Sequence, residues 1–298
     1  GFNRPYLGAF IGLLWFFMPN NLCAIFIEGN LARSLSMIFL PVFIYSVYKY
    51  LYNHKLRYIP LMVFTFLLME LCHLGYAGMV AIAVIIYGIV YIIQKGRKKA
   101  VLDVVISMIF GFMLLGIWLV ASLRGGITSL DNSENMANFF QNLWITINPF
   151  ERLTRGFEYF YFGFATLVVI VFGILFGYKK SRTGFVTGFI ILLMTTKSAY
   201  AVLKHLPGSQ YLWMLRFISI ALCMILMSFL MWDRLKKTLV LMLCVLLVVD
   251  TIPSLSLIVG EHNDISVQER MVARQDSTLI SSAQAVTKQR LALMDESI

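Results

Sequence analysis

The sequence predicts an all-α membrane protein built as a bundle of about nine transmembrane helices. Of its 298 residues, 59% are hydrophobic and 13% are charged, and the mean hydropathy is +0.80. Soluble domains carry about 25% charged residues, so this chain is far more apolar than they are. Its apolar runs also follow one another with only short breaks. We therefore expect one transmembrane helical domain over residues 1–259, with a polar tail over residues 260–298.

The net charge of +10 comes from short basic clusters between the apolar runs. The positive-inside rule places such clusters on the cytoplasmic side of a membrane. We attribute the charge to membrane topology and expect no nucleic-acid partner. The four cysteines lie in apolar segments without the paired spacing of metal ligands, which predicts buried free thiols.

A helix needs about 20 residues to cross about 30 Å of hydrocarbon. On this basis we expect spans near residues 6–27, 34–51, 60–72, 76–93, 100–122, 159–178, 184–203, 211–232 and 238–258. The first two are apolar runs on either side of the polar loop EGNLAR at 28–33. The fifth follows a basic cluster at 95–99, and the last three are separated by the polar segment 202–210 and by the basic cluster at 234–237.

Residues 60–93 are compatible with one very long helix or with a hairpin bent at His73 to Gly75. Basic clusters flank the run at residues 49–57 and 95–99, so both flanks are expected on the cytoplasmic side. The run must then cross the membrane an even number of times, which predicts the hairpin. Its first arm would reach only about 20 Å, so we expect the tip to lie below the outer surface.

Two polar segments are expected on the outer side. Between residues 123 and 158, apolar residues recur at steps of three and four, which predicts an amphipathic helix near 135–147 lying on the membrane surface, or else a lid over a site. The tail 260–298 is expected to start a soluble extracytoplasmic domain, or else to be disordered in isolation. The chain begins without methionine and ends within a pattern, so we expect it to be a piece of a longer protein.

Ionisable residues inside the predicted spans need a reason, because Arg, Lys or Asp at mid-helix costs about 2.5–3.5 kcal/mol. Glu70, Lys197, Arg216 and Asp250 all fall in the outer half of the membrane. They could pair with one another while the long cations reach the headgroups. Alternatively, Lys197, His205 and Arg216 form a cationic lining for a phosphate or pyrophosphate head, with a carboxylate nearby.

The sequence lacks several catalytic motifs. It contains no GxxxxGK[ST], GxGxxG, HExxH or GxSxG pattern, so nucleotide hydrolysis, dinucleotide chemistry, zinc proteolysis and elbow-type hydrolysis have no support. The histidines are scattered singly. We expect no cofactor, and a divalent metal stays open.

The segment EGNLARSLSMIFLPVFIYSVYKYL (28–51) contains Gly29, Asn30, Leu31, Arg33 and Pro41. In these positions it resembles bacterial multi-pass membrane proteins related to 6-pyruvoyl-tetrahydropterin synthase. The histidine hairpin at 73, PGSQYLWMLRF (207–217) and AVTKQRLALMD (285–295) are also similar to that group. The group's name suggests pterin chemistry, but the chain has no histidine cluster of the kind a zinc-dependent pterin enzyme needs.

That group in turn is similar to the GT-C type of integral membrane glycosyltransferases, which use polyprenyl-phosphate sugars at the outer face. The resemblance implies a protein of the bacterial cytoplasmic membrane with an extracytoplasmic site for a lipid-linked sugar. GT-C enzymes carry a catalytic Asp or Glu in their first outer loop, upstream of the region that corresponds to Gly1. Glu28 is an acid in an early outer loop of this chain, and it is not equated with that residue.

On this interpretation, Arg216 and Lys197 bind phosphate, His205 adds to the cationic lining, and Arg33 and His73 line the pocket. Glu70 or Asp250 serves as the catalytic carboxylate. An acceptor hydroxyl would attack the anomeric carbon while cations stabilise the departing polyprenyl phosphate. A transporter or lipid flippase, in which buried charges form a path through the membrane, is the first alternative. A non-catalytic assembly protein for cell-envelope polysaccharide is the second. The oligomeric state is left open.

Overall fold

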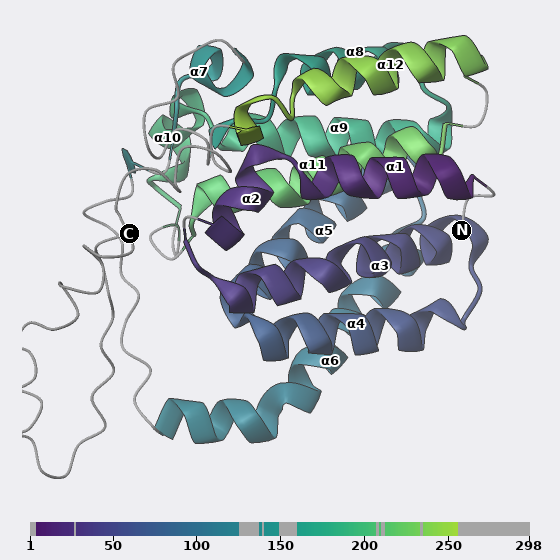
Figure 1. The fold of residues 1–298 in the computed structure, drawn as a ribbon. Coiled ribbons are helices and arrows are strands. Elements are labelled where there is room, and N and C mark those ends of the chain that lie inside the picture. Colours follow the sequence, from purple (N-terminus) through teal and green to yellow (C-terminus); the bar gives the residue numbers. More distant parts are fainter. Residues whose placement is uncertain are drawn as a thin grey trace, which may run out of the picture.

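The computed structural model describes residues 4–26, 28–124, 137–138, 140–148, 160–206, 209, 212–232 and 235–255, with the side chains of 117–119 and 121–124 left aside. Every named element in these ranges is a helix, which confirms the all-α prediction (Figure 1). They are α1 (Pro5–Phe16), α2 (Pro19–Phe26), α3 (Leu31–Asn53), α4 (Tyr58–Cys72), α5 (Leu74–Lys95), α6 (Lys98–Arg124), α7 (Leu143–Ile147), α8 (Phe164–Phe176), α9 (Lys179–Met194), α10 (Lys197–Leu203), the 3-10 helix η4 (Met214–Arg216), α11 (Phe217–Leu230) and α12 (Lys237–Val249).

Each of the nine predicted spans falls on one of these helices or on a pair of them, but their lengths differ. Within the described ranges, four helices are long and apolar enough to cross a membrane: α3, α5, α6 over Lys98–Gly116, and α12 extended to Leu255. A fifth is reached if α1 and α2, bent by 57° at their junction, form one broken span. α4, α8 and the η4–α11 segment are apolar but shorter. The described residues therefore contain several candidate membrane spans, and nine crossings stay a prediction.

The break between α4 and α5 consists of His73 alone. α4 ends at Cys72, and the His73 Nδ1 accepts the backbone N–H of Tyr76 at 3.0 Å, which caps the start of α5. At the far end of α5, the Tyr91 hydroxyl donates to the carbonyl of Leu51 in α3 at 2.6 Å. α5 therefore returns to the end at which α3 finishes and α4 begins, and the predicted hairpin is confirmed.

The bundle has two chemically different ends. At one, which we call the basic end, α3, α5 and α8 finish and α4, α6, α9 and α12 start. Tyr52 of α3 and Thr183 of α9 share a hydrogen bond of 2.6 Å there. The basic clusters of the sequence lie at this end, at residues 49–57, 95–99, 179–182 and 236–237. The opposite end carries the α2–α3 loop, His73, η4 and the end of α12.

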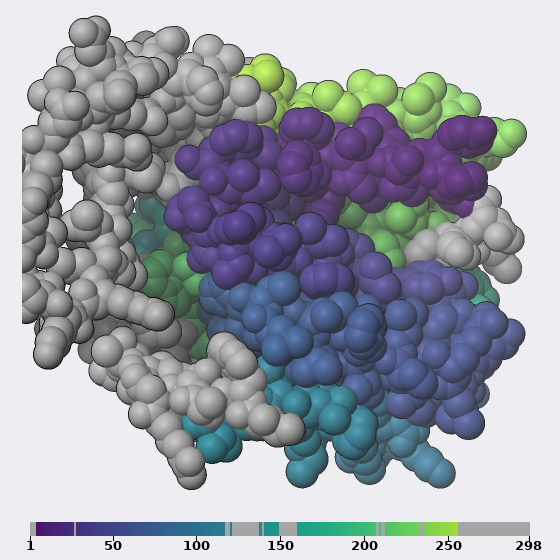
Figure 2. All heavy atoms as spheres, turned by 60° about the horizontal axis from the view of Figure 1, so that its bottom comes forward, coloured from purple at the N-terminus to yellow at the C-terminus, as the bar shows by residue number. Residues whose placement is uncertain are grey.

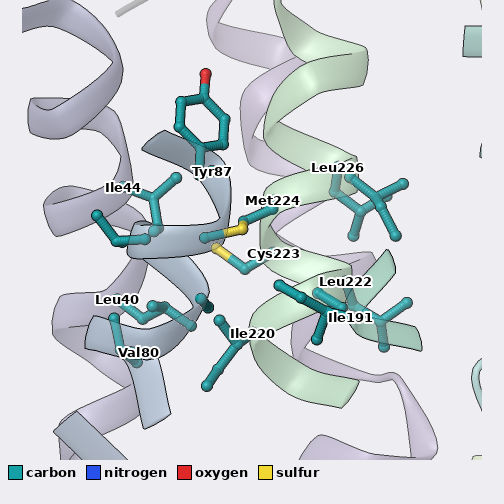
Figure 3. Close-up of a cluster of buried hydrophobic side chains, with 14 of the residues drawn as sticks. Leu40, Ile44, Val80, Tyr87, Ile191, Ile220, Leu222, Cys223, Met224 and Leu226 are labelled. Atoms are coloured by element: carbon teal, nitrogen blue, oxygen red, sulfur yellow. The ribbon is translucent and has the colours of Figure 1, made fainter. Parts of the chain in front are cut away.

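α11 forms the centre of the bundle. α8 and α12 lie along one side of it and α3, α4 and α6 along the other, with α5 and α9 beside it (Figure 1). All residues of α11 except Met227 are buried, and its apolar side chains meet those of α3, α5 and α9 in Figure 3. A Cβ at Gly184 of α9 would lie 1.9 Å from Ser228 Oγ of α11. This close approach supplies van der Waals packing, on which helices in lipid depend.

The amphipathic helix predicted near 135–147 is shorter than expected. Among the described residues, the α-helix covers only Leu143–Ile147, and Gln141 instead forms an isolated parallel bridge with Thr196 before α10. The Gln141 N–H donates to the Thr195 carbonyl at 3.3 Å, and the Lys197 N–H donates to the Gln141 carbonyl at 3.0 Å. The tail 260–298 lies outside the described residues.

Candidate functional site

The α2–α3 loop starts the site by fixing where α3 begins. Gly29 takes a φ of +56°, a left-handed conformation that favours glycine. The Asn30 side chain then accepts the backbone N–H of Arg33 at 2.8 Å and caps α3. This local geometry puts Arg33 in the first turn of α3 with its side chain directed inward, where its exposed fraction is 0%.

The buried Arg33 guanidinium has two side-chain partners among the described residues. Its Nη1 donates to Glu28 Oε1 at 2.6 Å, and its Nη2 donates to Asn20 Oδ1 at 3.1 Å. Asn20 in turn donates to the backbone carbonyl of Leu215 at 3.0 Å. The guanidinium carbon also lies 5.9 Å from the centre of the Tyr76 ring. Arg33 therefore ties the α2–α3 loop to α5 and, through Asn20, to η4.

Arg216 reaches the same carboxylate from the other side. Its Nη2 lies 3.6 Å from Glu28 Oε2, and its Nη1 lies 3.5 Å from His73 Nε2. Its guanidinium carbon stands 4.3 Å from the centre of the Trp213 ring, a cation–π contact. The side chains of Arg216 and Glu28 are 12% and 15% exposed, so both retain an accessible edge. Glu28, Arg33, His73 and Arg216 are called the Glu28 cluster below.

The contact between His73 and Arg216 joins two hydrogen-bond donors. Because Nδ1 of His73 accepts the Tyr76 N–H, the proton of the neutral ring lies on Nε2. The Arg216 guanidinium has donors only. Two N–H groups 3.5 Å apart cannot bond to each other. They can share one acceptor placed between them, and an oxyanion is the acceptor that suits a guanidinium best.

The surroundings of His73 keep its ring neutral. Burial lowers the pKa of His73 below its ordinary value of 6.5, and the charge of Arg216 lowers this pKa further. Near neutral pH the ring can therefore accept at Nδ1 and donate at Nε2 at the same time. Protonation of Nδ1 would break the cap of α5 and set a second positive charge beside Arg216.

Lys197 and His205, which were predicted to join the phosphate site, lie elsewhere at the same end of the bundle. Lys197 is the first residue of α10 and is exposed, and His205 is exposed just after α10. Among the described residues, no hydrogen bond or ion pair joins either side chain to the Glu28 cluster. Their binding roles stay predictions.

Asp250, one of the two predicted catalytic carboxylates, caps the start of α8. Its Oδ2 accepts the Thr166 N–H at 2.6 Å and the Thr166 hydroxyl at 2.8 Å, and its Oδ1 accepts the Ala165 N–H at 3.1 Å. The side chain is fully buried. A carboxylate at a helix N-terminus is stabilised by the free N–H groups and the helix dipole. This geometry favours a structural role that joins α12 to α8.

Glu70, the other predicted carboxylate, points toward α6. Its exposed fraction is 2%, and its Oε2 is buried without a hydrogen-bond partner among the described residues. A Cβ placed on Gly111 of α6 would lie 3.7 Å from this oxygen and 3.2 Å from Phe66. Glu70 therefore sits at the close contact of α4 and α6, and among the described residues no hydrogen bond or ion pair joins it to the Glu28 cluster.

Sequence reasoning found three members of the cluster and missed the carboxylate that joins them. Arg33, His73 and Arg216 were all predicted to bind substrate, and the structure brings them together. Glu28, Asn20 and Trp213 were not among the predicted site residues. A usable signal was the spacing of Glu28 and Arg33 around a Gly-Asn turn, which lets the two side chains meet. Within the described residues, no group of three His, Cys, Asp or Glu side chains could hold a metal ion.

Comparison with known proteins gives one match. A family model described as the 6-pyruvoyl-tetrahydropterin synthase related domain, a membrane protein, matches residues 2–258. No curated protein and no solved structure matches the chain. The matched range contains all four residues of the Glu28 cluster. The predicted membrane family is confirmed, and the likeness to GT-C glycosyltransferases stays a prediction.

Proposed function

We propose that this chain, which belongs to the 6-pyruvoyl-tetrahydropterin synthase related family of membrane proteins, binds the phosphate of a lipid-linked sugar in the Glu28 cluster and takes part in transfer of that sugar. The observation that carries the proposal is the pair of donors formed by His73 Nε2 and Arg216 Nη1, 3.5 Å apart. A phosphate oxygen placed between them can accept from both. Arginine suits phosphate because its fork of N–H groups matches the oxygens of the anion.

The remaining members of the cluster hold this donor pair in place. Glu28 fixes the Arg216 guanidinium through its Oε2, while the buried Arg33 fixes Glu28 through its Oε1. Trp213 supports the guanidinium from its face. Such a network sets the geometry of the donors before the ligand arrives, and preorganised donors stabilise a developing anion better than mobile ones.

The transfer would proceed by attack of an acceptor hydroxyl on the anomeric carbon of the sugar. The bond from that carbon to the phosphate oxygen breaks, and its electron pair stays on the polyprenyl phosphate. Arg216 and His73 would stabilise this leaving group. The hydroxyl proton passes to a carboxylate. Glu70 and Asp250 remain the predicted bases, and we add Glu28 because its carboxylate lies inside the cluster.

The position of the cluster supports an extracytoplasmic site. It lies at the end of the bundle opposite the basic end, and the positive-inside rule assigns basic clusters to the cytoplasmic side. We therefore propose that the protein lies in the bacterial cytoplasmic membrane with the Glu28 cluster toward the outer face. A polyprenyl-phosphate sugar would reach this end from within the bilayer.

The test is binding of polyprenyl phosphate by the purified protein in detergent. We compare wild type with Arg216→Ala, His73→Ala, Lys197→Ala and Lys236→Ala, the last being an exposed lysine at the basic end. We expect Arg216→Ala and His73→Ala to weaken binding about tenfold or more, a cost of about 1.4 kcal/mol or more, and Lys236→Ala to leave it unchanged. A loss confined to Lys197→Ala would move the site to α10. Equal binding by all five proteins would remove the phosphate site.

A transporter or lipid flippase is the rival function, and the broken α1–α2 span favours it. Interrupted helices that bend within the membrane are common at transporter substrate sites, and the bend here is 57°. Transfer of labelled lipid across proteoliposomes by the wild type, without release of sugar, would support this rival.

A further inference from the structure

We propose that Lys49 and Arg57, at the basic end of α3 and α4, bind the phosphate of an anionic phospholipid in the cytoplasmic leaflet of the membrane. The occupant is a diacyl lipid with a negative headgroup, such as phosphatidylglycerol. This site lies at the end of the bundle opposite the Glu28 cluster. It shares with the proposed function only the orientation of the bundle in the membrane.

Two tyrosines hold the two cations close together. The rings of Tyr45 in α3 and Tyr58 in α4 meet edge to face, with their centres 6.1 Å apart. Lys49 Nζ lies 5.5 Å from the centre of the Tyr45 ring, and the Arg57 guanidinium carbon lies 5.1 Å from the centre of the Tyr58 ring. Arg57 Nη2 also donates to the Tyr58 hydroxyl at 3.2 Å. The contact between α3 and α4 therefore positions both cations at one place.

The two positive charges remain open to an anion. Both Lys49 and Arg57 act electrostatically on the Tyr58 hydroxyl, Arg57 is exposed and Lys49 is partly exposed. At the basic end, the one acid among the described residues is Asp103, and its carboxylate accepts the Tyr50 hydroxyl at 2.5 Å. Phosphate suits this pair of cations, because arginine matches its oxygens with a fork of N–H groups and lysine adds a point charge.

The same face of α3 continues as an apolar surface toward the middle of the helix. Ile38, Val42, Tyr45 and Lys49 follow one another at steps of four, three and four residues, so they form one row. Ile38 and Val42 are 63% and 42% exposed, and Phe64 on α4 is 58% exposed. Figure 2 shows α3 and α4 side by side on one face of the molecule. Val42 lies about 10 Å from Lys49 along the helix, so acyl chains would contact this row while the phosphate reaches Lys49.

The combination of cations, tyrosines and an apolar row favours a phospholipid over other occupants. Tyrosine is enriched where a helix meets the membrane surface, and basic pockets between helices on the cytoplasmic side bind anionic headgroups. A soluble phosphate would gain nothing from the apolar row. An apolar helix of another protein would cover the row but would leave the two cations without a counterpart.

Native mass spectrometry of the full chain in detergent tests this inference. Delipidated protein is titrated with phosphatidylglycerol and, separately, with phosphatidylcholine that has the same acyl chains. The test variant is Lys49→Gln/Arg57→Gln. The matched control is Lys98→Gln/Lys99→Gln, which removes two exposed positive charges from the start of α6 at the same end of the bundle. A further titration of wild type with phosphatidylglycerol contains inorganic phosphate as a competitor.

We expect wild type to bind phosphatidylglycerol about tenfold or more tightly than phosphatidylcholine. Lys49→Gln/Arg57→Gln should lose this preference, and the control variant should keep it. Equal losses in the two variants would overturn the site, since any positive charge at the basic end would then suffice. Equal binding of both lipids by wild type would leave only an acyl contact. Displacement of phosphatidylglycerol by inorganic phosphate would overturn the lipid as occupant.

A second measurement covers the case in which Lys49→Gln/Arg57→Gln does not fold. Phosphatidylglycerol carrying a diazirine near the start of one acyl chain is photolysed with the wild-type protein, and the adducts are mapped by mass spectrometry. We expect adducts within residues 38–64 that unlabelled phosphatidylglycerol removes and phosphatidylcholine does not. Adducts confined to other helices, or adducts that both lipids remove equally, would overturn the inference.

Discussion

Replacing Glu28 with glutamine should destabilise the protein, because it leaves the Arg33 charge buried without its carboxylate. Arg33 is 0% exposed, and its Nη1 lies 2.6 Å from Glu28 Oε1. With charge centres about 4 Å apart and an effective dielectric constant of about 20, the attraction is about 4 kcal/mol. Measured costs of removing one partner of a buried pair are about 3–5 kcal/mol. The asparagine partner of Arg33 is neutral and cannot replace the lost charge.

The assay is the thermal unfolding midpoint of purified protein in one detergent. For a chain of this size, 1 kcal/mol shifts the midpoint by about 2–4 °C, so a cost of about 3–5 kcal/mol in Glu28→Gln should lower it by about 6–20 °C. The double variant Glu28→Gln/Arg33→Met also removes the Arg33 charge and should recover most of that loss, because Arg33 is the fully buried partner of Glu28, whereas Arg216 keeps an accessible edge. A Glu28→Gln midpoint equal to that of wild type, or a double variant as unstable as the single one, would refute the reasoning.

Three further predictions concern single residues. Gly163→Ala should lower the midpoint by several degrees, because the φ of Gly163 is +97° and the new Cβ would lie 2.0 Å from Asp250 Cγ. Gly116 has open space around it, so the control Gly116→Ala should not lower the midpoint. Equal midpoints for the two variants would contradict this prediction. Glu70→Leu should leave the midpoint unchanged or raise it, because Oε2 has no partner among the described residues; a clear fall would show a stabilising contact. The lowered pKa of His73 adds stability that is present above pH 6.5 and is lost as the pH falls through the folded-state pKa. Asparagine at this position can still cap α5 but does not titrate, so between pH 7 and 5 the unfolding midpoint of His73→Asn should fall less than that of wild type. Parallel curves of midpoint against pH would argue against this.

The sequence predicted the helical class, the hairpin and the grouping of basic clusters because each depends on local patterns. Apolar run lengths show where helices form, and charges between the runs show which ends share a side. The hairpin followed from the basic residues that flank residues 60–93. The broken α1–α2 span was not predicted, because the length of the apolar run over residues 6–27 does not show the bend before Pro19, where α2 begins. The bridge between Gln141 and Thr196 is long-range, so periodicity around residue 141 could not reveal it.

The candidate site was predictable only in part, because its geometry depends on contacts between distant segments. Arg216 and His73 are 143 residues apart, and only the packing of α11 against α5 brings them together. Asp250 caps α8 by accepting the N–H groups of Ala165 and Thr166, which lie 85 and 84 positions earlier in the chain. No local pattern around Asp250 in the sequence indicates this contact. Lys197 lies in an apolar stretch, which predicted a buried charge, but the chain bends at Thr195 and Thr196 and leaves Lys197 exposed at the start of α10.

The central claim is that His73 and Arg216 act together on one anion, and a double-mutant cycle on polyprenyl-phosphate binding tests it most directly. Affinities are measured for wild type, His73→Ala, Arg216→Ala and the double variant. Groups that share a ligand oxygen should be coupled by about 0.5–3 kcal/mol, so the double variant should bind only a little more weakly than the worse single variant. Additive losses would contradict a shared acceptor, and unchanged affinity in all four proteins would contradict the site.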